Sequence, residues 1–266
     1  MDAVLDCPDE TPPDVRRALE QLLEDQTLRS VVFRTQTEST NTDALGEVHR
    51  GLESGLLPRL HWADRQTAGR GRQGNTWISE GNALTFSLLL AGENLLESPL
   101  SMFVGVAVAQ AIEFHSAPVR VGLKWPNDLY ADGRKLGGIL IESSQAHLDQ
   151  VVVGVGVNVD DAPTLQSDRE VAATSLAEIA PRTVTRTDWL VAMVESIVQT
   201  LNEVDHAGLM EAFRERCVLT DTQVRLTQKD QSFSGRCTGV TENGELRLSI
   251  DGESRTFHSG DARRVR

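Results

Sequence analysis

Two lysines are the first candidates for chemistry in a chain that otherwise carries its positive charge on arginine. The sequence has three lysines against 23 arginines, and two of the three, Lys124 and Lys135, lie in neighbouring polar motifs. A lysine ammonium is a compact charge that the planar guanidinium of arginine does not reproduce. We therefore expect both lysines to face an anion; the alternative is two exposed surface lysines without a role.

A glycine-rich stretch with two arginines, Gly69-Arg70-Gly71-Arg72-Gln73-Gly74, is the second candidate, and Trp77 closes it. Glycine lets the backbone approach a ligand closely, and arginine offers a fixed fork of donors to an anionic group. The stretch lacks the Gly-Lys-Ser/Thr ending of a Walker phosphate loop. It predicts an anion-binding loop of another kind, with a mobile surface loop as the alternative.

Polar segments follow two of the strands that position this loop. Ser39-Thr40-Asn41 comes after a strand predicted over residues 31–35, and Gln66 comes after one predicted over 59–63. Hydroxyl and amide groups can both donate and accept hydrogen bonds. The threonine or the asparagine could instead cap the helix that follows.

The two lysine motifs belong to a later pair of predicted strands. A strand over residues 119–125 carries Lys124 to its end, where a proline stops the ladder. The Asn127-Asp128 pair that follows is either a set of binding groups or a turn. Asp132-Gly133 has the composition of a hairpin turn, which returns the chain through Lys135.

Two apolar segments are expected to form the core beneath these motifs. Residues 100–115 are apolar nearly all round, as in a buried helix. Residues 151–159 are almost wholly β-branched or glycine, which predicts a strand buried on both faces. Gly154 and Gly156 permit a ligand to approach that strand, and Asn158 lies at its end.

In their order along the chain, these motifs resemble those of the biotin protein ligases. Each motif alone is weak, but five in order are specific, and the resemblance runs from about residue 31 to the C-terminus. The matching stretches are Ser39-Thr40-Asn41, Gln66 with Gly69-Arg70-Gly71-Arg72-Gln73-Gly74, Lys124-Trp125-Pro126-Asn127-Asp128, Lys135-Leu136-Gly137-Gly138-Ile139-Leu140 and Gly154-Val155-Gly156-Val157-Asn158.

The resemblance implies a ligase reaction in two steps. Biotin and ATP form biotinyl-5'-AMP with release of pyrophosphate, and a lysine of a biotin carboxyl carrier protein or domain of an acyl-CoA carboxylase then takes the biotinyl group. It implies three catalytic residues: Lys135 between the biotin carboxylate and the α-phosphate, Arg72 ordering the glycine loop over the adenylate, and Asp128 steering or deprotonating the incoming amine.

The resemblance also implies a set of binding residues and small molecules. Biotin, ATP and Mg²⁺ are expected, and no protein residue is assigned as a metal ligand. The residues expected to contact biotin or the nucleotide are Ser39, Thr40, Asn41, Gln66, Gly69, Arg70, Gly71, Arg72, Trp77, Lys124, Asn127, Lys135, Gly138 and Asn158.

The fold implied is α+β, with a mixed sheet and helices like those of the class II aminoacyl-tRNA synthetases and a small C-terminal SH3-like barrel. We expect a short N-terminal helical extension over residues 1–30, frayed before a helix over 14–24. The biotin- and ATP-binding domain spans 31–218. Short strands with Asn-Gly and Asp-Gly turns over 219–266 predict a closed five-stranded barrel.

Composition limits the remaining function classes. A net charge of −13 with arginine favoured over lysine is typical of salt-loving organisms, and we expect a halophilic archaeon as the source. An acidic body is a poor ligand for nucleic acid. No apolar run approaches the ~20 residues of a membrane span, and no signal peptide is evident, so a cytoplasmic protein is expected. Three widely spaced cysteines predict neither a disulfide framework nor a zinc site.

Three expectations concern partners. Only about 30 residues precede the catalytic region, too few for the winged helix of the repressor forms, so we expect no specific DNA binding. A homodimer is an expectation of the resemblance alone. The rival functions are a lipoate ligase or octanoyl transferase of the same fold and, from another class, a nucleic-acid-binding protein using the arginine-glycine loop, which lacks the interleaved aromatics of such proteins.

Overall fold

The computed structural model describes residues 3–78, 83–92, 95, 99–145, 147–163, 172–181, 184–203 and 205–265. Within these residues one large mixed sheet forms the body of the protein. Its strands, in spatial order, are β1 (Val4–Asp6), β2 (Ser30–Thr37), β3 (Arg59–Gln66), β4 (Leu84–Ala91), β8 (His147–Val157), β7 (Arg134–Ser144), β6 (Asp128–Ala131) and β5 (Gly122–Lys124).

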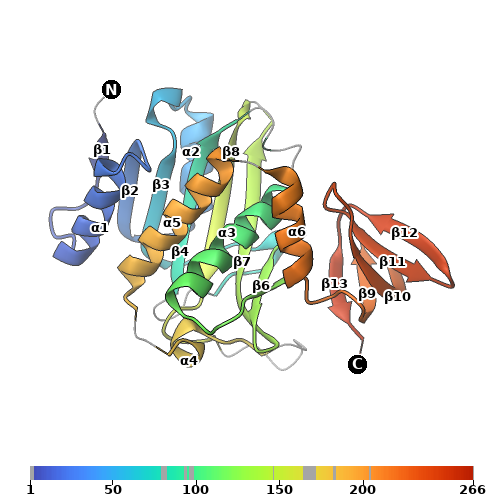
Figure 1. Cartoon of the computed structure of the whole chain (residues 1–266). Coiled ribbons are helices and arrows are strands. Elements are labelled where there is room, and N and C mark those ends of the chain that lie inside the picture. The colour runs from blue at the N-terminus through green and yellow to red at the C-terminus, as the bar shows by residue number, and fades with distance from the viewer. Residues whose placement is uncertain are drawn as a thin grey trace.

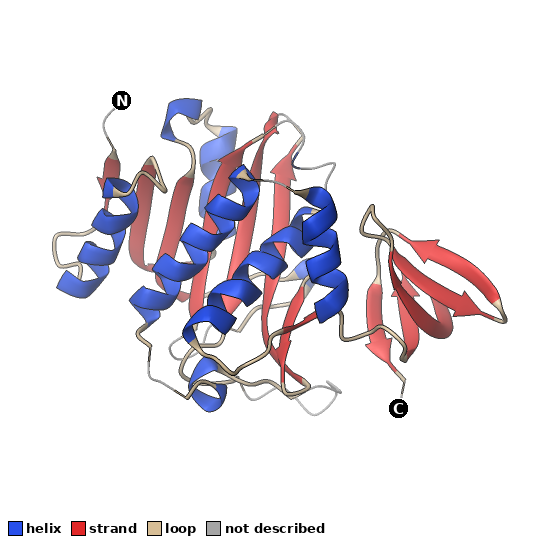
Figure 2. Ribbon diagram, viewed as in Figure 1, coloured by secondary structure: helices blue, strands red, loops and turns tan. Residues whose placement is uncertain are grey.

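Helices cover both faces of this sheet unequally (Figures 1 and 2). α1, α3, α5 and α6 pack against one another over one face, and α2 packs on the opposite face against β3, β4, β7 and β8. α4 is a single turn below the sheet. The helices are α1 (Pro13–Glu24), α2 (Thr40–His49), α3 (Leu100–His115), α4 (Leu176–Ile179), α5 (Arg186–Asn202) and α6 (His206–Arg216).

The expectation of a frayed start is wrong for the described part of the N-terminus. β1 pairs in parallel with β2, with Val4 opposite Ser30 and Asp6 opposite Val32. Arg34 forms an ion pair with Asp6 at 2.6 Å, and α1 packs against α5. Residues before 31 are thus integrated into the body, while the domain boundaries at 30 and 218 stay predictions.

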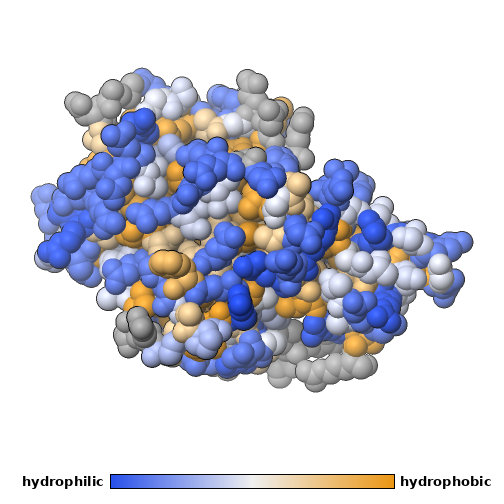
Figure 3. All heavy atoms as spheres, in the orientation of Figure 1, coloured by the Kyte–Doolittle hydropathy of each residue, from blue (hydrophilic) through white to orange (hydrophobic). Residues whose placement is uncertain are grey.

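Alternation along the central strands separates the two faces. In β3, Leu60 and Trp62 point to the side of α5, where Arg186 lies 5.4 Å from the Trp62 ring. Arg59 and His61 point to the side of α2, because successive side chains in a strand face opposite ways. The outer side of the helical layer is largely hydrophilic (Figure 3). The apolar faces of these helices are therefore buried against the sheet.

The predicted hairpin around Asp132-Gly133 is confirmed. Both turn residues have positive φ, 49° and 72°, as a two-residue turn of this kind requires. β6 and β7 pair across it, with Tyr130 opposite Lys135 and Asp128 opposite Gly138. The hairpin therefore brings an aspartate and a lysine seven residues apart to the same side of the sheet.

The C-terminal region forms a separate antiparallel sheet. Its described strands pair in the order β12 (Glu253–Phe257), β11 (Leu246–Ile250), β10 (Gln231–Val240), β9 (Gln223–Gln228) and β13 (Asp261–Arg264). No pairing closes β12 onto β13 among the described strands, so the closed barrel is not confirmed. Trp125 ties this sheet to the body, because its indole Nε1 donates to Gly244 O at 2.9 Å.

Neither α6 nor β13 is predicted by the sequence patterns. At the start of α5, Thr185 is the N-cap, and its hydroxyl accepts from the Asp188 backbone N–H at 3.1 Å. Among the described residues, no helix is long and apolar enough to cross a membrane.

Candidate functional site

A cavity of about 940 Å³ lies where the glycine loop, the β6–β7 hairpin, β8 and the edge of the C-terminal sheet meet. Apart from Gly69, every residue predicted to bind or react lines this cavity. Those residues are Ser39, Thr40, Asn41, Gln66, Arg70, Gly71, Arg72, Trp77, Lys124, Asn127, Asp128, Lys135, Gly138 and Asn158.

One end of the cavity is lined by uncharged polar groups in a closed network. The Gln66 Oε1 accepts from the Thr40 backbone N–H at 2.8 Å and from its hydroxyl at 3.1 Å. The Ser87 hydroxyl lies 2.7 Å from Thr40 Oγ1 and 2.5 Å from Asn41 Oδ1. A hydroxyl carries one proton, so Ser87 satisfies only one of these acceptors at a time. The other keeps a lone pair for an N–H donor of a ligand.

The alternative role of these residues as helix caps is not supported. Ser39 occupies the N-cap position of α2 without a side-chain cap hydrogen bond, and Thr40 and Asn41 already lie within the helix. Both side chains are buried and hydrogen-bonded across the sheet instead. Helix entry therefore serves to aim these groups into the cavity.

Two glycines in β8 leave room for this end of the cavity. A Cβ added at Gly154 would lie 2.2 Å from Asn41 Oδ1, and one added at Gly156 would lie 2.6 Å from the Trp77 indole. Real Cβ atoms do not approach other atoms so closely, so any other residue would displace Asn41 or Trp77. The glycine pair thus fixes the shape of the pocket floor.

Three buried polar atoms of the cavity lining have no hydrogen-bond partner among the described residues: Thr85 Oγ1, Trp77 Nε1 and Asn158 Oδ1. Leaving a buried donor or acceptor unpaired costs about 1–3 kcal/mol. Such atoms in a cavity are explained if a ligand supplies their partners. Two are groups of residues predicted from the sequence, and Thr85 is not.

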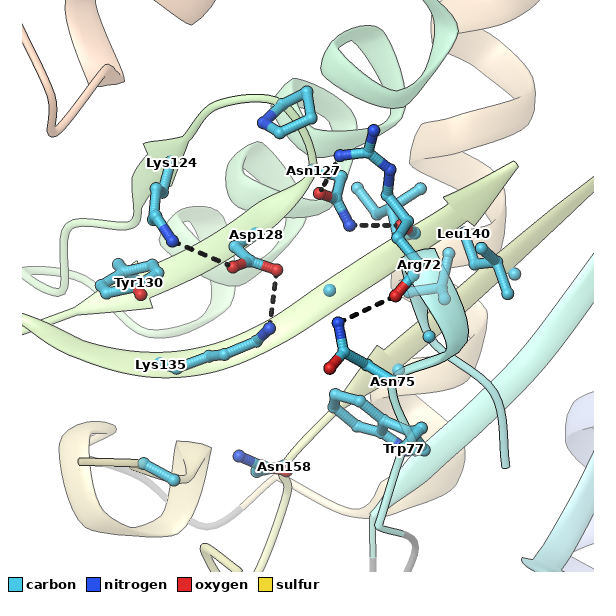
Figure 4. A pocket seen from close by; sticks show the side chains of 18 of the residues that line it. Arg72, Asn75, Trp77, Lys124, Asn127, Asp128, Tyr130, Lys135, Leu140 and Asn158 are labelled. Carbon is cyan, nitrogen blue, oxygen red and sulfur yellow. Dashed lines mark hydrogen bonds and ion pairs between the residues drawn. The ribbon is translucent and has the colours of Figure 1, made fainter. Parts of the chain in front are cut away.

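The opposite end of the cavity is charged, and Asp128 is its centre (Figure 4). Lys135 Nζ donates to Asp128 Oδ1 at 2.7 Å, and Lys124 Nζ lies 3.8 Å from Asp128 Oδ2. Lys124 Nζ also lies 3.8 Å from Asp261 Oδ1 on β13. The two lysines therefore share one carboxylate, and the C-terminal sheet contributes a second. The turn expected at Asn127-Asp128 coexists with these contacts.

Burial makes the charged form of two cations at this end less favourable. Desolvation lowers the pKa of the Lys124 ammonium, and the negative charges of Asp128 and Asp261 oppose that shift. Desolvation also lowers the pKa of Arg72, again opposed by Asp128 and Asp261. A further anion entering the cavity would stabilise both charged forms, because an opposite charge within a few ångströms favours ionisation.

The glycine loop folds as a small hairpin over the cavity. Gly71 N–H donates to Asn75 O at 2.7 Å and Trp77 N–H donates to Gly69 O at 2.9 Å. Gly69 is buried within this hairpin, where a Cβ would lie 2.6 Å from the Trp77 carbonyl oxygen. It therefore shapes the loop and does not line the cavity, which corrects its expected place among the contact residues.

The two arginines of the loop reach different parts of the site. Arg72 Nη1 donates to Asn127 Oδ1 at 3.1 Å, next to the charged end (Figure 4). Arg70 pairs with Glu142 at 2.5 Å, next to Asn41. One loop thus spans both ends of the cavity.

A short segment before α4 is bound alongside Lys135. The Lys135 backbone exchanges hydrogen bonds with this segment, from its N–H to Ala172 O and from Thr174 N–H to its own carbonyl, both at 2.9 Å. Asn158 Nδ2 donates to Thr174 O at 2.9 Å. The segment therefore holds Asn158 and Lys135 at a fixed spacing.

Four residues that bear on the site carry no clear sequence signal: Thr85, Ser87, Glu142 and Asp261. Thr85 and Ser87 lie in an otherwise apolar strand, where a small hydroxyl side chain looks like a packing residue. Asp261 precedes a pair of arginines in a region expected to serve as an appendage. Only the alternation of Thr85 and Ser87 on one face of β4 could have indicated a polar pocket floor.

No group of three or more His, Cys, Asp or Glu side chains able to hold a metal occurs within the described part of the chain. The three cysteines are free, with Cys217 and Cys237 buried, as expected of packing residues.

Family models match two segments of the chain. The biotin/lipoate A/B protein ligase family matches residues 32–158, and the biotin protein ligase C-terminal domain matches residues 221–262. The first segment contains most of the cavity residues. The second contains Asp261 and the C-terminal sheet.

Individual relatives agree with these models. The biotin–[acetyl-CoA-carboxylase] ligase of Mycobacterium tuberculosis is 32% identical over 241 residues, covering 87% of either chain. The bifunctional ligase/repressor of Bacillus subtilis is 29% identical over 75% of this chain and 64% of its own length. The biotin protein ligase of Aquifex aeolicus, solved with biotin and ATP, superposes with a TM-score of 0.74 at 26% identity, covering 88% of this chain and 99% of that one. This chain belongs to the biotin protein ligase family.

Proposed function

We propose that this protein joins biotin to ATP as biotinyl-5'-AMP and transfers the biotinyl group to a lysine of a biotin carboxyl carrier protein or domain. The observation that carries the proposal is the division of the cavity. An uncharged, hydrogen-bonding end built on Thr40, Asn41 and Ser87 adjoins a cationic end built on Lys124 and Lys135. Biotin has a neutral ureido ring at one end and a carboxylate at the other.

The charge of the cavity supports the same conclusion. Its lining contains seven arginines and lysines against two aspartates, in a chain of net charge −13. The first step must bring the biotin carboxylate against the triphosphate, so two anions approach each other. Fixed cations that stabilise the charge developing between them supply electrostatic catalysis. The concentration of cations here is thus what the chemistry requires.

Lys135 is the residue we assign to the reacting atoms of this step. Its side chain is one-third exposed and points towards Asp128 from the start of β7, next to the hairpin turn. In the free protein it is neutralised by Asp128. When the biotin carboxylate and the α-phosphate meet beside Lys135, its ammonium can leave Asp128 and stabilise the negative charge of the transition state instead.

Asp128 is assigned to the second step. Its carboxylate lies between Lys124 and Lys135, where it can orient the incoming lysine amine and accept its proton as the amine attacks the anhydride. The amide bond forms between the lysine nitrogen and the biotinyl carbonyl carbon as the bond from that carbon to the phosphate oxygen breaks. AMP is the leaving group, and the amine proton passes to Asp128. Arg72 is assigned to hold the loop over the anhydride, which would also exclude water from it.

A magnesium ion bound with the nucleotide would need only one or two oxygen ligands from the protein. Mg²⁺ in nucleotide enzymes keeps several waters and takes one or two protein ligands besides the phosphates. The buried Oδ1 of Asn158 has no partner among the described residues, and it lines the cavity. Asn158 is therefore the residue we assign to the ion, which would screen the phosphate charges when bound.

Other features of the function stay predictions. The residues before β2 form a strand and a helix of the body rather than a DNA-binding unit, which supports the prediction of no specific DNA binding. A gel shift on the upstream region of its own gene, with biotin and ATP, tests it: a retarded, salt-resistant band contradicts it. The homodimer, the closed barrel, the cytoplasmic location and the halophilic archaeal source remain expectations.

A pyrophosphate-release assay with biotin, lipoate and octanoate tests the main proposal. We expect release with ATP and biotin only, followed by labelling of an added biotin carboxyl carrier domain. Equal release with lipoate would instead support a lipoate ligase of the same fold. Release with none of the three acids would contradict the proposed activity altogether.

A further inference from the structure

We propose that Glu142 is a positioning residue that couples the neutral end of the cavity to the glycine loop. Its carboxylate oxygen Oε2 accepts from Asn41 Nδ2 at 2.9 Å and from Arg70 Nη2 at 2.5 Å. Asn41 comes from α2 and Arg70 from the loop, while Glu142 lies on β7 between them. One atom therefore joins a pocket residue to the element that covers the pocket.

The contact fixes which way the Asn41 amide faces. An asparagine amide presents an oxygen on one side and a nitrogen on the other, and its orientation is decided by its hydrogen bonds. With Nδ2 bound to Glu142, the Oδ1 atom is directed at Ser87, 2.5 Å away, and towards Gly154. The Leu140 carbonyl also accepts from Asn41 Nδ2, at the longer distance of 3.4 Å. Without Glu142, only that long contact among the described residues would keep the amide from rotating and presenting a donor where the pocket now presents an acceptor.

The same carboxylate holds the loop in register. The loop hairpin has its own internal hydrogen bonds, but it is tethered near the neutral end through Arg70 and near the charged end through the Arg72 contact to Asn127. The Arg70 side chain is 43% exposed and that of Glu142 is 24% exposed. Such a pair is partly screened by solvent and holds the loop reversibly.

These two contacts make loop closure depend on the state of the pocket. A ligand that hydrogen-bonds to Asn41 adds a restraint to an amide that Glu142 already orients, and that amide in turn helps to hold the Glu142 carboxylate where Arg70 reaches it. Loop closure and occupation of the neutral end thereby favour each other, as coupled equilibria require. The inference rests on the proposed function, because it takes biotin as the occupant of that end.

Glu142→Gln is the variant that separates the charge from the hydrogen bond. The glutamine oxygen still accepts from Asn41, but it loses the ion pair with Arg70. We expect pyrophosphate release at saturating biotin to change little. Escape of preformed biotinyl adenylate from the protein, measured by chase with unlabelled adenylate, should become about two- to fivefold faster, as the loss of one partly exposed ion pair allows.

Salt provides a readout that a merely structural residue would not affect. In the wild-type protein, raising the ionic strength should speed adenylate escape, because screening weakens the ion pair. In Glu142→Gln that dependence should largely disappear. Arg70→Gln should lose the same salt dependence of adenylate escape, whatever it does to synthesis, and the double variant should show no greater loss of that dependence than either single one, because both remove the same contact.

Asp6→Asn is the matched control, since it breaks an exposed ion pair with Arg34 far from the cavity. It should leave adenylate escape and its salt dependence unchanged. If wild type makes adenylate but Glu142→Gln releases it at the wild-type rate with the wild-type salt dependence, the coupling role is wrong. If wild type makes no adenylate from biotin and ATP, the proposed function itself has failed.

Discussion

The two ends of the cavity stabilise a ligand in opposite ways. At the neutral end, Thr40 and Asn41 are each 4% exposed, and their hydrogen bonds are already made within the protein. At the charged end, Lys135 is 34% exposed and its partner is another reactive group, Asp128. The neutral end is preorganised and needs no rearrangement to bind a ring. The charged end must exchange one partner for another when anions enter.

This difference divides specificity from chemistry. Buried polar groups that still lack a partner within the described structure, such as the Thr85 hydroxyl and the Trp77 indole N–H, reject a ligand that cannot pair with them, since each group left unpaired costs about 1–3 kcal/mol. Ion pairs that can exchange one partner for another discriminate less, but they can follow charge as it develops. Substitutions at the charged end should therefore change rates, and substitutions at the neutral end should change affinity and stability.

Lys135→Arg should have the largest effect and would test the charged end most directly. Charge is retained, but a compact donor is replaced by a wide fork that does not fit beside Asp128. We expect adenylate formation to slow by about 10²–10³-fold, the usual cost of losing one transition-state donor. Stopped-flow measurement of pyrophosphate release decides this, with a thermal unfolding midpoint near that of wild type as the control. An unchanged rate would remove Lys135 from the mechanism.

Glu47→Gln tests what holds the neutral end in place. Glu47 lies on α2, and its Oε2 is 2.6 Å from Arg59 Nε and 3.2 Å from His61 Nε2. Burial opposes ionisation of Glu47, but the hydrogen bond and charge of His61, with those of Arg59, lower its pKa from 4.5 to about 2. This shift corresponds to about 3 kcal/mol of folding stability. The variant should lose stability of that order.

The pH dependence of unfolding checks the same substitution. Because the pKa of Glu47 is lower in the folded state, its contribution is complete above about pH 4.5 and is lost as the pH falls towards 2. The free energy of unfolding of wild type, measured with urea, should therefore fall more steeply between pH 4.5 and pH 2 than that of Glu47→Gln. Glu253→Gln, which breaks an exposed pair with Arg255, should follow wild type. If the unfolding free energy of Glu47→Gln depends on pH in the same way as that of wild type, Glu47 does not stabilise the folded state through Arg59 and His61.

Arg72→Gly should lose retention of the adenylate more than its synthesis, because Lys135 would still promote the first step. Arg72 contacts Asn127 from the loop, and losing one charge-assisted contact of roughly 1.5–3 kcal/mol raises escape about 10- to 150-fold. Escaped adenylate would acylate exposed lysines. A biotin blot of an unrelated lysine-rich protein incubated with the variant, biotin and ATP should show strong labelling. Equal labelling by wild type would show that Arg72 does not hold the glycine loop over the adenylate.

The same contrast explains which features the sequence predicts. The charged end comes from motifs close together in the chain, and the Asp132-Gly133 turn alone brings Asp128 to Lys135. Glycine, proline and lysine have few structural substitutes, so their positions are informative. The helix predicted over residues 100–115 has the bounds of α3 because it is apolar throughout.

What could not be predicted depends on long-range packing. Asp261 reaches Lys124 only because the C-terminal sheet docks next to the end of β5, where Trp125 donates to Gly244 O. β1 has three residues, too few for a period, and is stabilised by pairing with β2. The sequence predicts Thr85 and Ser87 only as strand residues, because their role in the pocket depends on their lying on the same face as Asn41 and Trp77. Local pattern therefore defines the reacting groups better than the pocket that orients them.

Thr85→Val and Ser87→Ala, the smallest expected effects, compare two hydroxyls on one face of β4. The Thr85 hydroxyl is buried without a partner among the described residues, whereas that of Ser87 contacts Thr40 and Asn41. Removing the Ser87 hydroxyl should cost about 1 kcal/mol of stability and weaken biotin binding. Removing the Thr85 hydroxyl breaks no bond within the protein, so folding stability should hold or rise slightly.

Biotin affinity then decides the role of Thr85. If its hydroxyl is paired by bound biotin, Thr85→Val should bind biotin about three- to tenfold more weakly, in line with about 0.5–1.5 kcal/mol for one hydrogen bond. Thermal unfolding and calorimetric titration measure the two quantities on the same samples. Weaker binding with unchanged stability would assign Thr85 to the ligand. Wild-type affinity with raised stability would mean that the hydroxyl is an unpaired group that neither fold nor ligand uses, and that the neutral end stops at Ser87.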